Sequence, residues 1–245
     1  MKAVILAAGS STRLYPLTID QPKCLLEVGD QTLIEHQLDA LATCGVTEVV
    51  IVTGYLSHLI TGRVEDLKAG YPFAVRFAHN ARFAGTNNLY SLWTAREQIE
   101  GEDFLCMHAD VLFHPEILRA GARATDDVCL VADRAVLDET MKLKTVGSRV
   151  KEVGKHLSMN EASGTFLGLA KFSVAGGRRV MAETEKLVEA GETNLYFTAA
   201  IERMIADGFP VAACFTEGLA WIEIDVAEEL AVAREQIFPL LAGAA

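Results

Sequence analysis

The sequence predicts an α/β protein with a mostly parallel central sheet and helices on both faces of that sheet. Short apolar runs rich in β-branched residues alternate along the chain with segments of helical periodicity, the pattern typical of such a sheet. The 245 residues are enough for a substantial core, and no repeat, low-complexity stretch or interdomain linker divides them. We therefore expect a single domain over residues 1–245.

The first half of the chain supplies five predicted strands. They cover Ala3–Leu6, Glu48–Thr53, Ala74–Ala78, Asp103–His108 and Val128–Ala132. Apolar residues recur at helical spacing over Thr32–Cys44, and Gly45 offers a stop for that helix. A further helix is predicted to begin near Asn87.

The second half begins with a predicted β-hairpin. Two short alternating runs surround Gly147 and Ser148 within Met141–Val153, so we expect an insertion at about residues 141–155 that forms a small lid over the site. The elements predicted after the hairpin are a strand at Gly164–Phe172, helices around Arg178–Glu189 and Leu195–Ala206, a strand at Val211–Phe215, and a helix at Val226–Ile237 with an Ala-rich tail.

Composition limits the partners of the protein. The 22 basic and 33 acidic residues give a formal charge of −11, which disfavours a nucleic-acid surface. The five cysteines are an odd number without a Cys-x-x-Cys pair, which is typical of reduced thiols in a reducing compartment. No run approaches the roughly 18 apolar residues of a membrane span. We expect a cytoplasmic protein with no nucleic-acid or membrane partner, and we leave a homo-oligomer open.

The loop that follows the first predicted strand is suited to hold a triphosphate. Small residues let backbone N–H groups approach an anion closely, and Arg13 and Lys23 supply positive charge. The loop has no second Gly of the Walker pattern, and Ser11 and Leu14 stand where the dinucleotide fingerprint needs Gly. An ordinary strand-to-helix loop with two incidental cations is the alternative. The candidate nucleotide-binding residues here are Leu6, Ala7, Ala8, Gly9, Ser10, Ser11, Thr12, Arg13 and Lys23.

Carboxylates follow two predicted strands at places where ligands gather in α/β sheets. Asp110 comes just after the strand that ends at His108, and Asp225 follows the apolar run that begins at Trp221. Glu223 lies two residues before Asp225, so both side chains face one side of a strand and can share a cation. A triphosphate is commonly neutralised by Mg²⁺ held by one or two carboxylates. Helix N-capping is the alternative role for the aspartates, and His108 and His114 do not have a recognised zinc spacing.

These motifs together resemble those of the nucleotidylyltransferases that activate sugar phosphates and small alcohol phosphates. The resemblance runs from Leu6 through Leu26 and continues in the Leu33–Gln37 segment, with Ser11 in place of the family's usual second Gly. We expect Ser11 to be tolerated there at a negative φ. The resemblance implies a Rossmann-like nucleotidyltransferase fold. It also implies catalytic roles for Arg13, Lys23, Asp110 and Asp225, and a metal held by Asp110, Glu223 and Asp225.

Two further segments resemble the bacterial cytidylyltransferases that act on phosphocholine and 2-aminoethylphosphonate. They are Asn87–Leu92 and Gly164–Ser173, and they imply CTP as the nucleotide, with Gly85, Thr86 and Asn87 near its base. Lys155 resembles the family's second lysine and is expected, with Tyr196 and Trp221, at the acceptor. A solvated lysine in a turn is the alternative for Lys155. Thr165 and Ala199 stand where those enzymes have carboxylates, which puts choline or ethanolamine specificity in doubt.

The predicted reaction transfers CMP from CTP to a small phosphate- or phosphonate-bearing acceptor and releases pyrophosphate. Aromatic side chains at Phe166, Tyr196, Phe197 and Trp221 are candidates for a cage around a quaternary ammonium, or else core residues. One alternative is a sugar-1-phosphate nucleotidylyltransferase that uses UTP, dTTP or GTP. Another is a catalytically silent nucleotide-binding regulatory domain.

Overall fold

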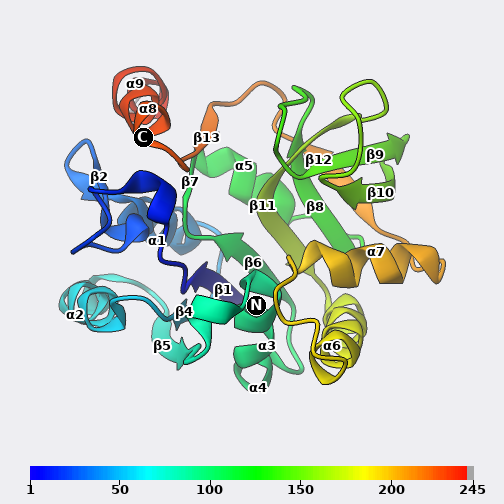
Figure 1. The fold of residues 1–245 in the computed structure, drawn as a ribbon, viewed down its shortest axis with the longest axis horizontal. Helices are drawn as coiled ribbons and strands as arrows, with labels where there is room; N and C mark the ends of the chain where they lie inside the picture. Colours follow the sequence, from blue (N-terminus) through cyan, green and yellow to red (C-terminus); the bar gives the residue numbers. More distant parts are fainter. Residues whose placement is uncertain (242–245) are drawn as a thin grey trace.

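A nine-stranded sheet forms the centre of the computed structural model, which describes residues 1–241, so the expected Ala-rich tail at 242–245 lies outside the described residues (Figure 1). The strand order is β5-β4-β1-β6-β11-β8-β12-β10-β9. Only β10 and β11 run against the other strands, so the predicted mostly parallel sheet is confirmed. The strands are β1 (Lys2–Ala7), β4 (Glu48–Thr53), β5 (Ala74–His79), β6 (Phe104–His108), β8 (Val128–Asp133), β9 (Lys142–Val146), β10 (Arg149–Gly154), β11 (Gly164–Phe172) and β12 (Ala212–Phe215).

Helices and two small strand pairs surround this sheet. Strand β7 (Val111–Phe113) pairs with β13 (Trp221–Glu223), and β2 (Glu27–Val28) pairs with β3 (Gln31–Thr32). In residues 1–241, no helix has both the length and the apolar character needed to cross a membrane. The helices are α1 (Leu33–Ala42), α2 (Ser57–Leu67), α3 (Asn88–Thr94), α4 (Arg96–Ile99), α5 (Pro115–Ala122), α6 (Val174–Glu189), α7 (Thr198–Ala206), α8 (Ala227–Val232) and α9 (Phe238–Leu241), with a π-helical turn between the last two.

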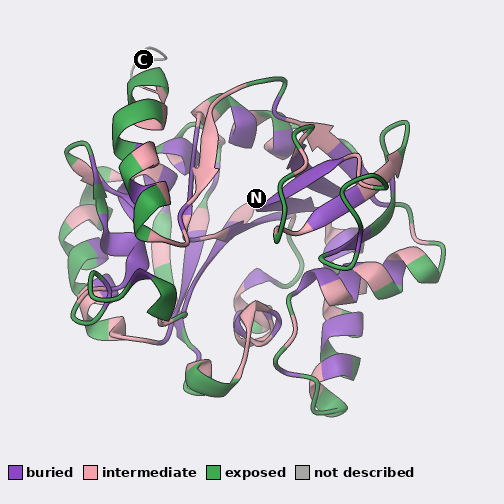
Figure 2. Ribbon diagram, turned by 45° about the horizontal axis from the view of Figure 1, so that its top comes forward, coloured by how far each residue is buried: buried purple, intermediate pink, exposed green. Residues whose placement is uncertain are grey.

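The two faces of the sheet carry separate apolar layers. Alternate residues of a strand point to opposite faces, so Val4 and Leu6 of β1 join the layer with α3, α6 and α7. Ala3 and Ile5 join the other layer, with α1, α2 and α5. Figure 2 shows the central strands buried between these layers and the C-terminal helix largely exposed. A smaller cluster around Leu33, Leu112 and Leu230 holds α8 to the domain.

Most predicted elements agree with the structure, and the differences have local causes. Helix α7 begins at Thr198 rather than Leu195, because Thr193 and Leu195 accept backbone hydrogen bonds from the start of α3 and stay outside the helix. Helix α6 begins at Val174, earlier than predicted, because the Ser173 hydroxyl accepts from the Gly176 N–H as an N-cap.

The predicted hairpin is formed by β9 and β10, but it is not a lid. Strand β10 pairs with β12 and β9 pairs with β11, so both strands prolong and curl the main sheet. Backbone hydrogen bonding of these strands to the sheet edge outweighs a separate position over the site. The parts of this region that reach the cavity are the preceding segment 137–141 and the following Lys155.

The order of the strands determines where a ligand can bind. The chain passes from β1 to β4 and β5 on one side and then returns to β6 on the other side of β1. Loops after β1 and β6 therefore diverge and leave a crevice at the carboxyl ends of these strands, as at the switch points of other α/β sheets.

Ser11, in the loop after β1, adopts a left-handed conformation, contrary to the expectation of a negative φ. Its φ is 50° and its ψ is 47°. The Ser11 carbonyl accepts from the Leu14 N–H at 3.0 Å and from the Thr18 hydroxyl at 2.8 Å, so both bonds hold this conformation. The position requires the backbone for which Gly is suited.

We predict that Ser11→Gly raises the free energy of unfolding by about 0.5–1 kcal/mol, because relief of left-handed strain exceeds the entropy cost of Gly. Urea denaturation followed by circular dichroism measures the change. Ser10→Gly is the matched control, since φ at Ser10 is not positive and the substitution adds only flexibility. Stabilisation by both variants, or by neither, would contradict the assignment of strain to Ser11.

Candidate active site

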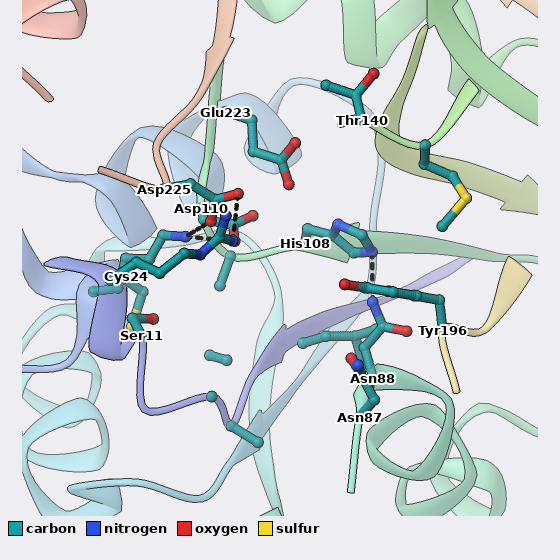
Figure 3. Close-up of a pocket in the computed structure, with 18 of the residues that line it drawn as sticks. Ser11, Cys24, Asn87, Asn88, His108, Asp110, Thr140, Tyr196, Glu223 and Asp225 are labelled. Carbon is teal, nitrogen blue, oxygen red and sulfur yellow. Dashed lines mark hydrogen bonds and ion pairs between the residues drawn. The ribbon is translucent and has the colours of Figure 1, made fainter. Parts of the chain in front are cut away.

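One cavity of about 980 Å³ lies at the carboxyl ends of β1 and β6 (Figure 3). It collects residues that are far apart in the sequence. Three of the predicted site residues, Ser10, Thr12 and Gly85, do not line it. Thr12 and Gly85 are exposed to solvent, each in a 3₁₀ turn. The predicted residues that line the cavity are Leu6, Ala7, Ala8, Gly9, Ser11, Arg13, Lys23, Thr86, Asn87, Asp110, Lys155, Tyr196, Trp221, Glu223 and Asp225.

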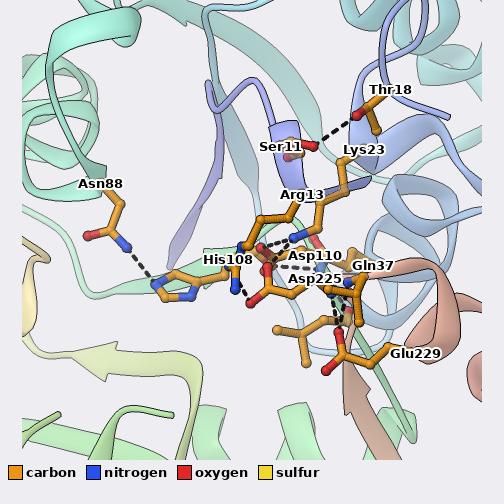
Figure 4. Close-up of polar contacts among 12 residues, drawn as sticks. Ser11, Arg13, Thr18, Lys23, Gln37, Asn88, His108, Asp110, Asp225 and Glu229 are labelled. Atoms are coloured by element: carbon orange, nitrogen blue, oxygen red, sulfur yellow. Dashed lines mark hydrogen bonds and ion pairs between the residues drawn. The ribbon is translucent and has the colours of Figure 1, made fainter. Parts of the chain in front are cut away.

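A charged cluster occupies one end of the cavity (Figure 4). Lys23 Nζ lies 2.9 Å from Asp110 Oδ2 and 2.7 Å from Asp225 Oδ1. The Arg13 guanidinium lies 2.7 Å from Asp225 Oδ2. Burial lowers the pKa of Lys23, but the two carboxylates outweigh burial and raise it above its ordinary value. Burial raises the pKa of Asp110, and the Lys23 ammonium reverses this and holds it below its usual range. Lys23 and Asp110 are therefore both charged at neutral pH.

Backbone contacts hold the two aspartates in place. Asp110 lies in the turn between β6 and β7, and its carbonyl accepts from the Ile224 N–H at 3.0 Å. Pairing of β7 with β13 brings the Asp225 segment alongside. The Glu229 carboxylate, in the first turn of α8, accepts from the backbone N–H groups of Asp225 and Val226. The backbone segments that carry both aspartates are thus held in place.

Gln37 of α1 stabilises the turn that contains Asp110. Its side-chain amide donates to the His108 carbonyl at 2.8 Å and to the Val111 carbonyl at 2.9 Å. Gln37 is only 1% exposed, so its side chain makes these bonds in the protein interior, where an unpaired polar group is costly. The residue closes the turn from which the Asp110 side chain extends.

The acidic groups of the cavity have the character of a cation site. Asp110 Oδ1 is buried and has no hydrogen-bond partner in the described chain. Burial and repulsion from Asp110 and Asp225 raise the pKa of Glu223 to about 8, which a bound cation would reverse. One ligand atom each from His108, Asp110 and Glu223 lie within 4.8 Å of one another. The predicted set had Asp225 in place of His108, but both oxygens of Asp225 face Lys23 and Arg13 in the structure.

Aromatic and polar residues line the opposite end of the cavity. Lys155 Nζ lies 5.3 Å from the centre of the Tyr196 ring and covers one of its faces. Phe166 and Phe197 are almost fully buried, and their rings pack edge-on against each other and against His108. These contacts pack the two phenylalanines into the wall of the cavity, and the aromatic cage considered from the sequence stays a prediction.

Several cavity residues lacked a local sequence signal. Asn80 is 1% exposed, and its amide donates to the hydroxyls of Thr86 and Ser91, both at 3.1 Å. Asn88, Glu229 and the segment 137–141 also contact the cavity. The Asn87-Asn88 pair was visible in the sequence, and the structure shows that Asn87 caps α3 while Asn88 points into the cavity (Figure 3).

The fold and the cavity together define a nucleotidyltransferase. The chain belongs to the family of MobA-like NTP transferase domains, whose model matches residues 3–192. The nucleotidyltransferase resemblance of the sequence and the predicted fold class are thereby confirmed.

Known relatives include cytidylyltransferases. The CTP:phosphoglutamine cytidylyltransferase of Campylobacter jejuni is 26% identical over 96% of this chain and 100% of its own length. The solved structure of the CTP:phosphocholine cytidylyltransferase of Streptococcus pneumoniae matches with a TM-score of 0.77 and 26% identity, over 96% of this chain and 97% of that one. The inositol-1-phosphate CTP transferase of T. maritima shares the fold, with a TM-score of 0.84 and 20% identity over 99% and 95% of the two chains.

We predict that Gln37→Leu lowers the free energy of unfolding by about 1–3 kcal/mol, because it leaves two buried carbonyls without a donor. Urea denaturation measures this loss. Gln31→Leu is the matched control, since its amide bonds only to the exposed Asp39 carboxylate and its loss should stay within about 0.5 kcal/mol. Equal stability of the two variants would show that Gln37 does not brace the Asp110 turn.

Proposed function

We propose that the protein transfers CMP from CTP to a small acceptor that carries a phosphate or phosphonate, of the phosphocholine or 2-aminoethylphosphonate class. The observation that carries the proposal is the convergence of Arg13, Lys23, Asp110 and Asp225 on one cavity. Similarity over the full chain to relatives named as cytidylyltransferases supports the choice of CTP.

The proposed chemistry is a displacement at the α-phosphorus of the nucleotide. An oxygen of the acceptor phosphate forms a bond to this phosphorus, the bond to the α,β-bridging oxygen breaks, and its electron pair leaves with pyrophosphate. A phosphate monoester has its second pKa near 6, so at neutral pH it is mostly a dianion and needs no general base. The task of the protein is to position the reactants and to neutralise charge.

Arg13 and Lys23 serve the triphosphate in this scheme. Arg13 binds the β- and γ-oxygens of the leaving pyrophosphate, and Lys23 binds the α-phosphate. In the free protein both cations contact carboxylates, so nucleotide binding exchanges carboxylate oxygens for phosphate oxygens. The exchange keeps the buried ammonium of Lys23 paired throughout.

Magnesium fits the carboxylates that this exchange releases. Asp110 and Asp225 would hold the ion, with Glu223 beside them, since hard oxygen ligands suit Mg²⁺ and Asp110 Oδ1 has no other partner. When bound, the ion supplies positive charge against the negative charge of the triphosphate. The residues themselves only need to stay ionised and in place.

The base and the acceptor occupy opposite ends of the cavity in this proposal. The base lies over the turn Ala7–Gly9 and meets Thr86 and Asn87, with Asn80 as an additional amide nearby. Lys155 binds the acceptor phosphate, and Tyr196 and Trp221 contact the rest of the acceptor.

A panel of nucleotides and acceptors tests the proposed reaction. Pyrophosphate release is measured for CTP, UTP, dTTP and GTP against phosphocholine, 2-aminoethylphosphonate and sugar 1-phosphates, with Mg²⁺ and with excess EDTA. We expect turnover with CTP and a non-sugar acceptor, abolished by EDTA. Faster turnover with UTP and a sugar phosphate would assign the protein to sugar activation instead, and no turnover with any pair would indicate a silent nucleotide-binding domain.

We predict that Lys23→Ala or Asp110→Ala lowers turnover at least about a hundredfold, a rise in barrier on the order of 3 kcal/mol, because each removes a charge that the transition state needs. Lys144→Ala is the control, since this lysine pairs with Glu152 on the hairpin outside the cavity. Circular dichroism establishes that each variant is folded. Near wild-type pyrophosphate release from either cavity variant would refute the assigned roles.

A further inference from the structure

His108 lies at the boundary between the two ends of the cavity. It is the last residue of β6, two positions before Asp110, and its ring packs edge-on against Phe166 and Phe197. In residues 1–241, the only hydrogen bond of the His108 ring joins Nε2 to the Asn88 amide nitrogen, at 3.0 Å. Figure 3 shows the opposite edge of the ring open toward Glu223 and the cavity.

Asn88 determines which imidazole nitrogen carries the proton. The Asn88 side-chain oxygen accepts from the Phe197 N–H at 2.7 Å, which fixes the orientation of the amide. The NH₂ group of Asn88 must then face His108 Nε2 and donate to it (Figure 4). A nitrogen that accepts a hydrogen bond carries no proton, so the proton of the neutral ring lies on Nδ1.

Gly168 leaves the space that this ring occupies. Gly168 lies beside the imidazole with a φ of +75°, at an irregularity in the pairing of β11 with β8. A Cβ atom at residue 168 would approach His108 Nδ1 to 2.4 Å. Asn88 on one side and the bulged Gly168 on the other thus hold the ring in a single orientation.

His108, Asp110 and Glu223 lie close enough together to hold a metal ion, but the tautomer of His108 argues against a role of this ring as a metal ligand. A metal ligand needs the lone pair of the nitrogen that faces the ion, and Nδ1 bears a proton. An N–H donor directed into a cavity is instead suited to an anionic oxygen. The cavity already supplies Arg13 and Lys23 to the nucleotide phosphates, whereas His108 lies toward Tyr196 and Phe197 at the acceptor end.

We propose that Asn88 holds His108 as the neutral Nδ1–H tautomer and that His108 donates this N–H to an oxygen of the acceptor's phosphate or phosphonate group. The inference rests on the proposed function and adds a binding residue to it. His108 and Lys155 then contact the acceptor anion from two elements, β6 and the end of the hairpin. The donor is uncharged, so it orients the oxygen without neutralising the nucleophile.

The tautomer is tested first, independently of turnover. ¹⁵N NMR of the full-length protein labelled at histidine distinguishes the two neutral tautomers, and the His108 signals are those missing from His108→Asn. We expect the Nδ1–H form in the free protein. The Nε2–H form would overturn the proposal whatever the activity of the enzyme.

Two substitutions of His108 then distinguish the roles of its two ring nitrogens in steady-state kinetics. Asn places an amide nitrogen where Nδ1 of His lies, and Gln places one where Nε2 lies. We expect His108→Asn to keep the KM for the best acceptor of the panel within about threefold, and His108→Gln to raise it about tenfold or more, since hydrogen bonds to charged groups have this strength. The KM for CTP should change less than twofold in both.

A control variant and two different negative results distinguish failure of the His108 role from failure of the proposed function. His36→Gln is the matched control, because His36 bonds to the Val28 carbonyl away from the cavity and its substitution should leave the acceptor KM unchanged. Equal acceptor KM values for His108→Asn and His108→Gln overturn the role of His108 while the reaction stands. Absence of turnover in the wild-type panel overturns the proposed function, and with it the acceptor contact, even if the Nδ1–H tautomer is found.

Discussion

The pairing of the buried Lys23 ammonium with Asp110 and Asp225 is the interaction on which the architecture of the cavity depends. An ammonium that is only 7% exposed needs anions close by, because an unpaired buried charge is very costly. The three partners come from the loops after β1 and β6 and from the junction of β13 with α8. The ion pairs of Lys23 therefore join three segments that are far apart in the sequence, at the carboxyl ends of β1 and β6. Gln37 and Glu229 act on this contact through the main chain, since they hold the segments that carry the two aspartates.

The cluster contains three carboxyl groups and two cations, and this composition has a chemical consequence. Asp110 and Asp225 pair with Arg13 and Lys23, and burial together with repulsion from these two aspartates raises the pKa of Glu223 to about 8. Glu223 is thereby held toward its neutral form in the free protein. Any anion that attracts Arg13 and Lys23 leaves the two aspartates without partners. A polyphosphate and a divalent cation are then expected to bind together, because each relieves the charge that the other leaves exposed. The ion pairs of the free protein thus keep the cavity stable until both ligands arrive.

The elements of the fold could be predicted from the sequence because their signals are local. Runs such as Glu48–Thr53 are apolar and β-branched, and they form strands with the predicted bounds. The site was predictable in part: the motifs located Arg13, Lys23, Asp110 and Asp225, but the contacts that fix them depend on tertiary structure. The bonds of Gln37 to the β6–β7 turn and of Asn88 to His108 and Phe197 span 20 to 109 positions and leave no periodic pattern. The conformation of Ser11 was mispredicted because its carbonyl is held by Leu14 and Thr18, which residue type alone does not show.

Thr165 illustrates how the acceptor end of the cavity depends on such contacts. From the sequence, Thr165 marks the loss of a carboxylate in a strand that faces the site. In the structure it is fully buried, its hydroxyl accepts from the Leu137 N–H at 3.0 Å, and it lies 3.3 Å from the Thr140 hydroxyl. These bonds attach the segment 137–141 to β11, and Asp138 and Glu139 of that segment line the cavity. The acidic groups available to an acceptor at this end therefore come from the attached segment, and Thr165 affects the acceptor through the position of that segment.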